Sequence, residues 1–309
     1  GRWRCSSTPI QAAFIDSSLF APTLASTYPQ AAMMAGLPDG HMLAAAAGII
    51  PVAYAFAYVL ARRLIGKGDA CPWELADVLF HVPYVPLLLY LIVAALAELA
   101  PRGVMGRWHE HTVETRLFLA LYLVHCTLHV GVLALKRHVS SPTMYIAHHV
   151  LSISCYGFAL VSRRMHFWAV LDALCEVTNV FLNNIFLFRS LGWDARLPTA
   201  YTVNGALLWL SYVAFRLCLF PYWLWLFARD VRYHPLITWD QVTPFERYAY
   251  SGTTLLLLGI SLVWFEKITA GLLTAIRTGP GAGKGGATSH GGEEISTCLK
   301  QNVASTKCS

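Results

Sequence analysis

The sequence predicts an all-α protein, a polytopic transmembrane helical bundle of about seven spans. Of the 309 residues, 56% are apolar and only 13% are charged. Soluble domains carry roughly twice that share of charged residues, about 25%. The mean hydropathy is +0.50, and the apolar residues form runs long enough to cross a bilayer, which takes about 20 helical residues. Together these observations exclude a soluble domain.

Basic residues close most of the apolar runs, as is usual where a span meets lipid headgroups. The expected spans are about 41–61, 74–99, 114–134, 142–161, 166–188, 199–228 and 247–272. Pro83 and Pro86 lie inside the second run and predict a kink there, because proline removes a backbone donor. The stretch 100–113 is expected to be an interfacial connector between two spans.

The ends of the chain differ in composition from the bundle, which is expected over 41–272. Residues 1–40 are rich in Ser, Thr, Pro and Ala and are predicted to be poorly ordered or interfacial. The tail, taken as 273–309, has almost no apolar content after Thr278. We expect the tail to be disordered, because it cannot bury enough surface to offset the entropy of ordering.

The charge and cysteine patterns exclude two classes of partner. The net charge of +6 is spread over short connectors and the tail, whereas nucleic-acid binding needs clustered Lys and Arg, so no nucleic-acid partner is expected. The eight cysteines show no CxxC pair. We therefore expect free thiols, with neither a disulfide framework nor a metal site.

Polar residues inside the spans are the functional signal, since each ionisable one costs about 2.5–3.5 kcal/mol to insert. In the third span, Tyr122, His125 and His129 share one helical face by their spacing. A second stripe in the fourth span, with His148 beside it, consists of Tyr145, His149, Ser152 and Tyr156. For His125 or His129 taken alone, a packing role is at least as good an explanation as a chemical one.

The fifth span carries two carboxyls and two amides at helical spacing, namely Asp172, Glu176, Asn179 and Asn183. This face must point at protein or at a water-filled cavity, because a lipid-facing arrangement would leave polar groups unsatisfied. Arg216, near the middle of the sixth span, is the expected counter-ion of Asp172 or Glu176. Each of the two asparagines by itself also fits a role as interhelical glue.

Three short motifs in order resemble the TLC domain, the membrane domain of ceramide synthases and TRAM proteins. A basic connector at 136–138 leads into the helix that bears the pair His148-His149. Residues 176–183 are similar to a Glu-x-Ser/Thr-x-x-x-x-Asn signature of the non-synthase branch. Asn204-Gly205 followed by Arg216 resembles a late helix of the same branch. The resemblance covers about 107–232.

The non-synthase resemblance implies a protein that binds, senses or regulates membrane lipids, either sphingolipids or phospholipids, through a polar pocket and without a cofactor. We expect it in the endoplasmic reticulum or another endomembrane rather than in the plasma membrane. The residues expected to contact lipid or substrate are His125, His129, Tyr145, Ser152, Tyr156, Glu176, Asn179, Asn183, Asn204 and Arg216.

The synthase resemblance implies instead an N-acyltransferase with acyl-CoA as co-substrate. His148, His149 and Asp172 would then be catalytic, with a carboxylate fixing the tautomer of a histidine base. The sequence departs from the synthases at Leu171, which stands where they have a histidine, and their second Asp has no clean match. Whether the chain is an enzyme therefore stays open.

Two further functions fit the sequence less well. A di-iron oxygenase is suggested by His125-x-x-x-His129 and the histidine pair. The sequence before the pair is Tyr145-Ile146, with Tyr145 at the first position of an HxxHH box, so this box is absent, and metal sites need a complete ligand set. A transporter would show inverted repeats or broken helices in matching halves. Only the prolines of the second span point that way.

Overall fold

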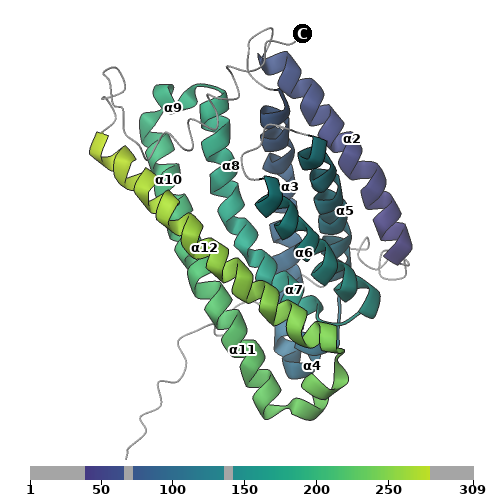
Figure 1. Ribbon diagram of the computed structural model, residues 1–309. Coiled ribbons are helices and arrows are strands. Elements are labelled where there is room, and N and C mark those ends of the chain that lie inside the picture. The colour runs from purple at the N-terminus through teal and green to yellow at the C-terminus, as the bar shows by residue number, and fades with distance from the viewer. Residues whose placement is uncertain (1–38, 66–71, 136–141, 279–309) are drawn as a thin grey trace, which may run out of the picture.

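Helices account for nearly all of the described chain. The computed structural model describes residues 39–65, 72–135 and 142–278, and within them seven helical segments are long and apolar enough to cross a membrane (Figure 1). The prediction of an all-α polytopic bundle of about seven spans is confirmed. The predictions for residues 1–38 and 279–309 lie outside the described residues.

The spans follow one another along the chain, and several contain short irregular turns. In order, the elements are α2 (Asp39–Ile65), α3 (Pro72–Leu99), η2 (Ala100–Arg102), α4 (Gly103–Trp108), α5 (Val113–Leu135), α6 (Pro142–Ser162), α7 (His166–Ala173), η3 (Leu174–Glu176), α8 (Val177–Ser190), α9 (Trp193–Arg196), α10 (Pro198–Tyr212), η4 (Val213–Cys218), α11 (Leu219–Tyr233), η5 (Pro235–Ile237), η6 (Trp239–Gln241) and α12 (Pro244–Thr278).

The observed helices contain the expected spans and extend beyond most of them. The second span stays helical through Pro83 and Pro86. The last helix continues to Thr278, six residues past the expected boundary at 272, so the tail begins later than expected. The fifth and sixth spans are interrupted by η3, a 3₁₀ turn, and by η4, a π-helical turn.

The stretch 100–113 is more than an interfacial connector. It contains helix α4, whose residues Arg107 and Trp108 are buried. The Arg107 guanidinium donates to both carboxylate oxygens of Asp230 on α11, at 2.6 and 2.7 Å, and Trp108 Nε1 donates to the same carboxylate at 3.1 Å. Charge and aromatic content indicated only a connector, because the partner of Arg107, Asp230, is far away in the sequence. The interfacial position of this stretch stays a prediction.

Tryptophan rings join three helices beside this ion pair. Trp108 of α4, Trp168 of α7 and Trp223 of α11 are all almost fully buried. The ring centroids of Trp168 lie 5.6 Å from Trp108 and 5.0 Å from Trp223, both in edge-on geometry. Trp223 Nε1 also donates to the backbone carbonyl of Trp168 at 3.0 Å. This packing fixes α7, and with it the start of the span that carries Asp172 and Glu176.

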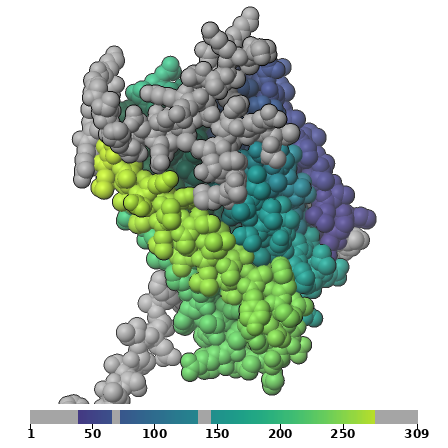
Figure 2. Space-filling model, in the orientation of Figure 1, coloured from purple at the N-terminus to yellow at the C-terminus, as the bar shows by residue number. Residues whose placement is uncertain are grey.

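Helix α12 lies on the outside of the bundle. It crosses the face shown in Figures 1 and 2 diagonally, and only 11% of its most apolar stretch is buried. Many of its exposed side chains are large and apolar, among them Leu255, Leu256, Leu262 and Val263. Apolar exposure on this scale marks a surface that faces a membrane or a partner rather than water.

Candidate functional site

Helices α3, α5 and α6 bring four imidazole rings together inside the bundle. The histidine cluster consists of His81, His125, His129 and His149. The ring centroids of His81 and His125 lie 5.0 Å apart, and His125 stacks on His129 at 5.7 Å. Nδ1 of His129 lies 2.7 Å from Nε2 of His149, a hydrogen bond between α5 and α6. Three of the four rings were candidates from the sequence.

Asp77 of α3 supports this cluster, and the sequence reasoning missed it. Its Oδ1 lies 3.7 Å from Nε2 of His129 and accepts a hydrogen bond from the Tyr54 hydroxyl at 3.3 Å. His81, four residues later on the same helix, has Nδ1 within 2.7 Å of the Asp77 carbonyl oxygen. A carboxyl and an imidazole at i and i+4 inside an apolar run were the signal that could have revealed both residues.

The contacts from Asp77 to His129 and from His129 to His149 determine which ring nitrogen of each histidine carries the proton. A carboxylate beside Nε2 of His129 favours the proton on that nitrogen, which leaves Nδ1 of His129 as an acceptor. Nε2 of His149 must then be the donor in the 2.7 Å bond. Nδ1 of His149 is consequently an unprotonated acceptor, and it is buried without a hydrogen-bond partner among the described residues.

Glu176 is the centre of a second polar group, the Glu176 group, which consists of Tyr122, Glu176 and Asn179. The Tyr122 hydroxyl donates to one carboxylate oxygen at 2.9 Å, and the Asn179 side-chain amide donates to the other at 2.6 Å. The structure thus joins residues that the sequence placed on two different spans. His148 lies within electrostatic range of both Glu176 and Arg216.

Arg216 is buried on the π-helical turn η4. Its Nε donates to the Thr178 hydroxyl at 3.1 Å, and its guanidinium carbon lies 5.3 Å from the Tyr212 ring and 6.0 Å from the Trp264 ring. Within residues 39–65, 72–135 and 142–278, no carboxylate oxygen comes within 4.0 Å of this guanidinium. The direct ion pair expected with Asp172 or Glu176 is therefore absent from the described part of the chain.

The 3₁₀ turn η3 explains why neither Asp172 nor Glu176 forms the expected ion pair with Arg216. The expectation assumed one regular helical face for Asp172, Glu176 and Asn179, but the 3₁₀ turn Leu174–Glu176 separates the two carboxyls. Asp172 then faces α12, where it accepts a hydrogen bond from Thr254 at 3.3 Å. Glu176 faces α5 and is satisfied by Tyr122 and Asn179. Both carboxylates thus have hydrogen-bond partners on other residues, and neither makes a short contact with Arg216.

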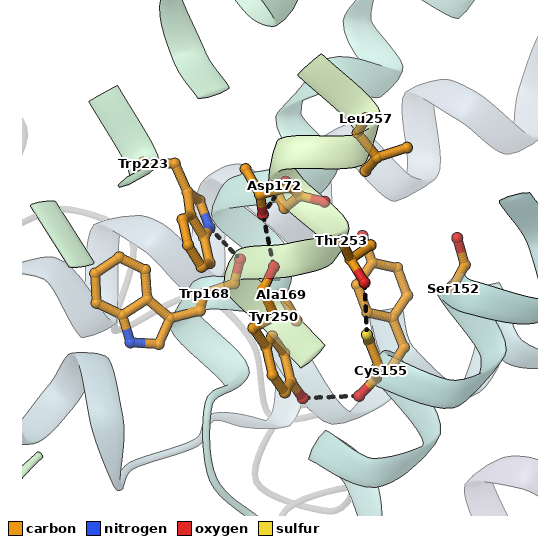
Figure 3. A pocket seen from close by; sticks show the side chains of 11 residues that line it. Ser152, Cys155, Trp168, Ala169, Asp172, Trp223, Tyr250, Thr253 and Leu257 are labelled. Atoms are coloured by element: carbon orange, nitrogen blue, oxygen red, sulfur yellow. Dashed lines mark hydrogen bonds between the residues drawn. The ribbon is translucent and has the colours of Figure 1, made fainter. Parts of the chain in front are cut away.

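A small cavity lies against Asp172 (Figure 3). Its volume is about 20 Å³, enough for roughly one water molecule. Its lining residues are Ser152, Cys155, Tyr156, Trp168, Ala169, Asp172, Trp223, Tyr250, Thr253, Thr254 and Leu257. Ser152 and Tyr156 thus lie near Asp172. No hydrogen bond or ion pair in the described chain joins Asp172 to His148 or His149.

The remaining candidates lie at the edges of these groups. The Tyr145 ring is 6.1 Å from the Trp264 ring. Asn204 of α10 donates to the Phe181 carbonyl at 2.8 Å and accepts from Asn184 at 3.2 Å. Asn184, the neighbour of the candidate Asn183, thus makes the side-chain contact between α8 and α10.

The histidine cluster does not have the geometry of a metal site. In the part of the chain that the structure describes, no group of three or more His, Cys, Asp or Glu side chains could hold a metal ion. Two of the rings, His125 and His129, lie nearly parallel at 13°, an arrangement in which rings stack instead of pointing their nitrogens at one centre. What the site offers is hydrogen-bond acceptors, a hydrogen-bonded carboxylate and one buried cation.

Comparison with known proteins places the whole site within one matched region. Residues 74–270 match the family model described as TLC domain, and this range includes every candidate site residue. TLC domain-containing protein 1 of Gallus gallus is 29% identical over 114 residues, which is 37% of this chain and 43% of that relative. The match thus spans less than half the length of the relative. No solved structure matches the chain.

Proposed function

Because the chain belongs to the TLC-domain family, a membrane family, we propose that it binds membrane lipids through the polar groups inside its bundle and so senses or regulates lipid composition. The observation that carries this proposal is the buried Arg216, whose guanidinium has no carboxylate within hydrogen-bonding distance among the described residues. A lipid headgroup that bears a phosphate would supply the missing negative charge.

The physical argument starts from the cost of the buried charge. Removing a guanidinium from water costs several kcal/mol even after the protein relaxes, unless a nearby anion and hydrogen bonds offset it. Here the offset comes from one hydroxyl, two aromatic rings and the more distant charge of Glu176. The planar fork of arginine matches a phosphate bidentately. A phosphate would therefore add the anion that no carboxylate of the described residues supplies at hydrogen-bonding distance.

The other polar groups fit the rest of a headgroup. Nδ1 of His149 is an acceptor without a partner, suited to a hydroxyl or amine hydrogen. Asn179 is half-buried beside Glu176 and offers an amide. The bound acyl chains would lie on apolar side chains of the spans. The cavity at Asp172, about 20 Å³, is too small for a headgroup, so Asp172 contributes to packing around the site rather than to lipid contact.

The first prediction tests Arg216 directly. We expect Arg216→Leu to lose the co-purifying phospholipid or sphingolipid that wild type retains, with an affinity at least about tenfold lower, because a hydrogen bond to a charged group is worth roughly 1.5–3 kcal/mol. The measurement is mass spectrometry of lipids bound to the purified full chain. Arg189→Leu, at the exposed end of α8, is the matched control. An unchanged set of bound lipids in the Arg216 variant would refute the proposal.

The chain Asp77–His129–His149 favours a second candidate function, the N-acyltransferase. An unprotonated Nδ1 on His149 could accept the proton of a lipid amine while the amine attacks an acyl-CoA thioester. A carbon–nitrogen bond would form, the carbon–sulfur bond would break, and the CoA thiol would leave with a proton. The structure changes the expected supporting residue, because the carboxylate in contact with the histidines is Asp77 and not Asp172.

A second prediction separates the two functions. Membranes that contain wild type are compared by lipidomics with membranes that contain His148→Ala/His149→Ala at matched protein levels. For lipid binding without chemistry, we expect no N-acylated sphingoid lipid whose amount depends on the histidine pair. If only wild type raises such lipids, the acyltransferase is the correct function, and Asp77→Leu should abolish the increase as well.

A further inference from the structure

A groove between α11 and α12 lies apart from the polar site. Its volume is about 450 Å³, within the roughly 300–1,000 Å³ of small-molecule sites. Its lining residues are Leu224, Phe227, Ala228, Val231, Arg232, Trp239, Ser251 and Leu255. None of these side chains belongs to the histidine cluster or to the Glu176 group. The groove is therefore a separate candidate site.

The polarity of the groove changes along its length. Leu224 and Phe227 lie within α11, whereas Arg232 is one residue before the end of that helix. Eight residues of helix separate Leu224 from Arg232, which is about 12 Å along the axis. On the other wall, Leu255 lies about three turns into α12. One end of the groove is thus apolar and deep in the spans, and the other carries a cation at the end of the bundle.

Trp239 marks the cationic end as an interface. It lies on η6, in the connection between α11 and α12, and the Arg247 guanidinium carbon is 5.5 Å from its ring centroid. Tryptophan collects where spans meet lipid headgroups, because its ring is amphipathic. The mouth of the groove is therefore at headgroup level, and its apolar end is at the level of the acyl chains.

Arg232 presents its charge at this mouth. Its side chain is exposed, and in the described ranges no carboxylate lies within 4.0 Å of it. The neighbouring Asp230 is buried and already bound by two nitrogens of Arg107, Nε and Nη2. Asp240, on the same connection, is exposed and pairs with no arginine at that distance. The guanidinium of Arg232 is thus available for an anion from outside the chain.

We propose that this groove binds one phospholipid, with its phosphate on Arg232 and one acyl chain along Leu224, Phe227 and Leu255. The charge, the apolar wall and the interfacial tryptophan match the phosphate, the chain and the headgroup boundary of such a lipid in the same order. The site is independent of Arg216, so it does not depend on the function proposed above.

The test is native mass spectrometry of the full chain with phosphatidylglycerol, phosphatidylcholine or diacylglycerol, which share chains but differ in phosphate and charge. We expect wild type to bind one more phospholipid molecule than Arg232→Leu, whose affinity for that molecule falls about tenfold. Ala228→Phe, which fills the exposed groove from its wall, should abolish that molecule. Both variants should retain whatever lipid depends on Arg216.

Arg63→Leu is the matched control, because Arg63 is an exposed arginine near the end of α2. It should bind as wild type does. Equal loss in Arg232→Leu and Arg63→Leu would show general charge attraction and overturn the proposal. Binding of diacylglycerol as tight as that of both phospholipids would also overturn it, because the phosphate would then contribute nothing. Preference for phosphatidylglycerol over phosphatidylcholine would identify the source of the phosphate as an anionic lipid.

Discussion

Asp230→Ala is expected to lower the free energy of unfolding by about 3–5 kcal/mol, the usual cost of removing one partner of a buried ion pair. The change would leave the Arg107 guanidinium buried without its two charge-assisted bonds of 2.6 and 2.7 Å. Trp108 would lose its acceptor as well. The measurement is denaturant or thermal unfolding of the full chain in mixed micelles.

Two comparisons separate the ion pair from general damage. The double variant Arg107→Leu/Asp230→Leu removes both charges, so it should lose clearly less than the sum of the two single losses. Glu98→Ala removes one partner of the exposed contact with Arg102, and exposed pairs contribute about 0–1 kcal/mol. If Glu98→Ala and Asp230→Ala lower the free energy of unfolding equally, the buried Arg107–Asp230 pair does not stabilise the contact between α4 and α11 as expected.

Asp77→Leu is expected to change the tautomer of His149 and, through it, ligand binding. Without the carboxylate, the contact that favours the proton on Nε2 of His129 is lost, so Nδ1 of His149 ceases to be a fixed acceptor. A ligand that donates to this nitrogen would then lose about 1–3 kcal/mol, or roughly 5- to 150-fold in affinity, because its donor would be left unpaired. Asp77 acts through His129 and is therefore a positioning residue.

The readout for Asp77 is the ¹⁵N spectrum of the imidazoles in the reconstituted protein. A difference spectrum against His149→Gln identifies the His149 signals, and their shifts report which nitrogen carries the proton. Asp77→Glu should keep the wild-type tautomer, and Tyr54→Phe, which removes only one donor to Asp77, should change it little. If the His149 signals are the same in Asp77→Leu and in wild type, the supporting role of Asp77 is wrong.

Much of the architecture could be predicted from the sequence because membrane insertion depends on local composition. A span needs about 20 apolar residues, and each such run in the chain lies in an observed helix. The order of the polar motifs was likewise sufficient to indicate the TLC family that residues 74–270 match. Polar residues that share one face of a regular helix were also predictable, as the stacked rings of His125 and His129 on α5 show.

Interruptions inside helices were harder to predict. The spacing of Asp172 and Glu176 indicated a shared face, but the turn η3 follows Asp172 and includes Glu176. Asp172 therefore contacts Thr254, whereas Glu176 contacts Tyr122. Arg216 lies on the π-helical turn η4. No proline or glycine occurs within either turn, so the local sequence lacked the usual signal for a break. Irregular turns of this kind are frequent at functional sites.

The sequence by itself determined the membrane class, the approximate spans and the candidate polar residues, because these follow from the cost of each side chain in lipid. The tertiary structure decided the partners. Only the packing of α3 and α6 on α5 places Asp77 beside His129 and His129 beside His149. Only the approach of α4 to α11 buries Arg107 with Asp230. Such pairings depend on the rotation of each helix about its axis and on contacts between residues far apart in the chain, which no local pattern encodes.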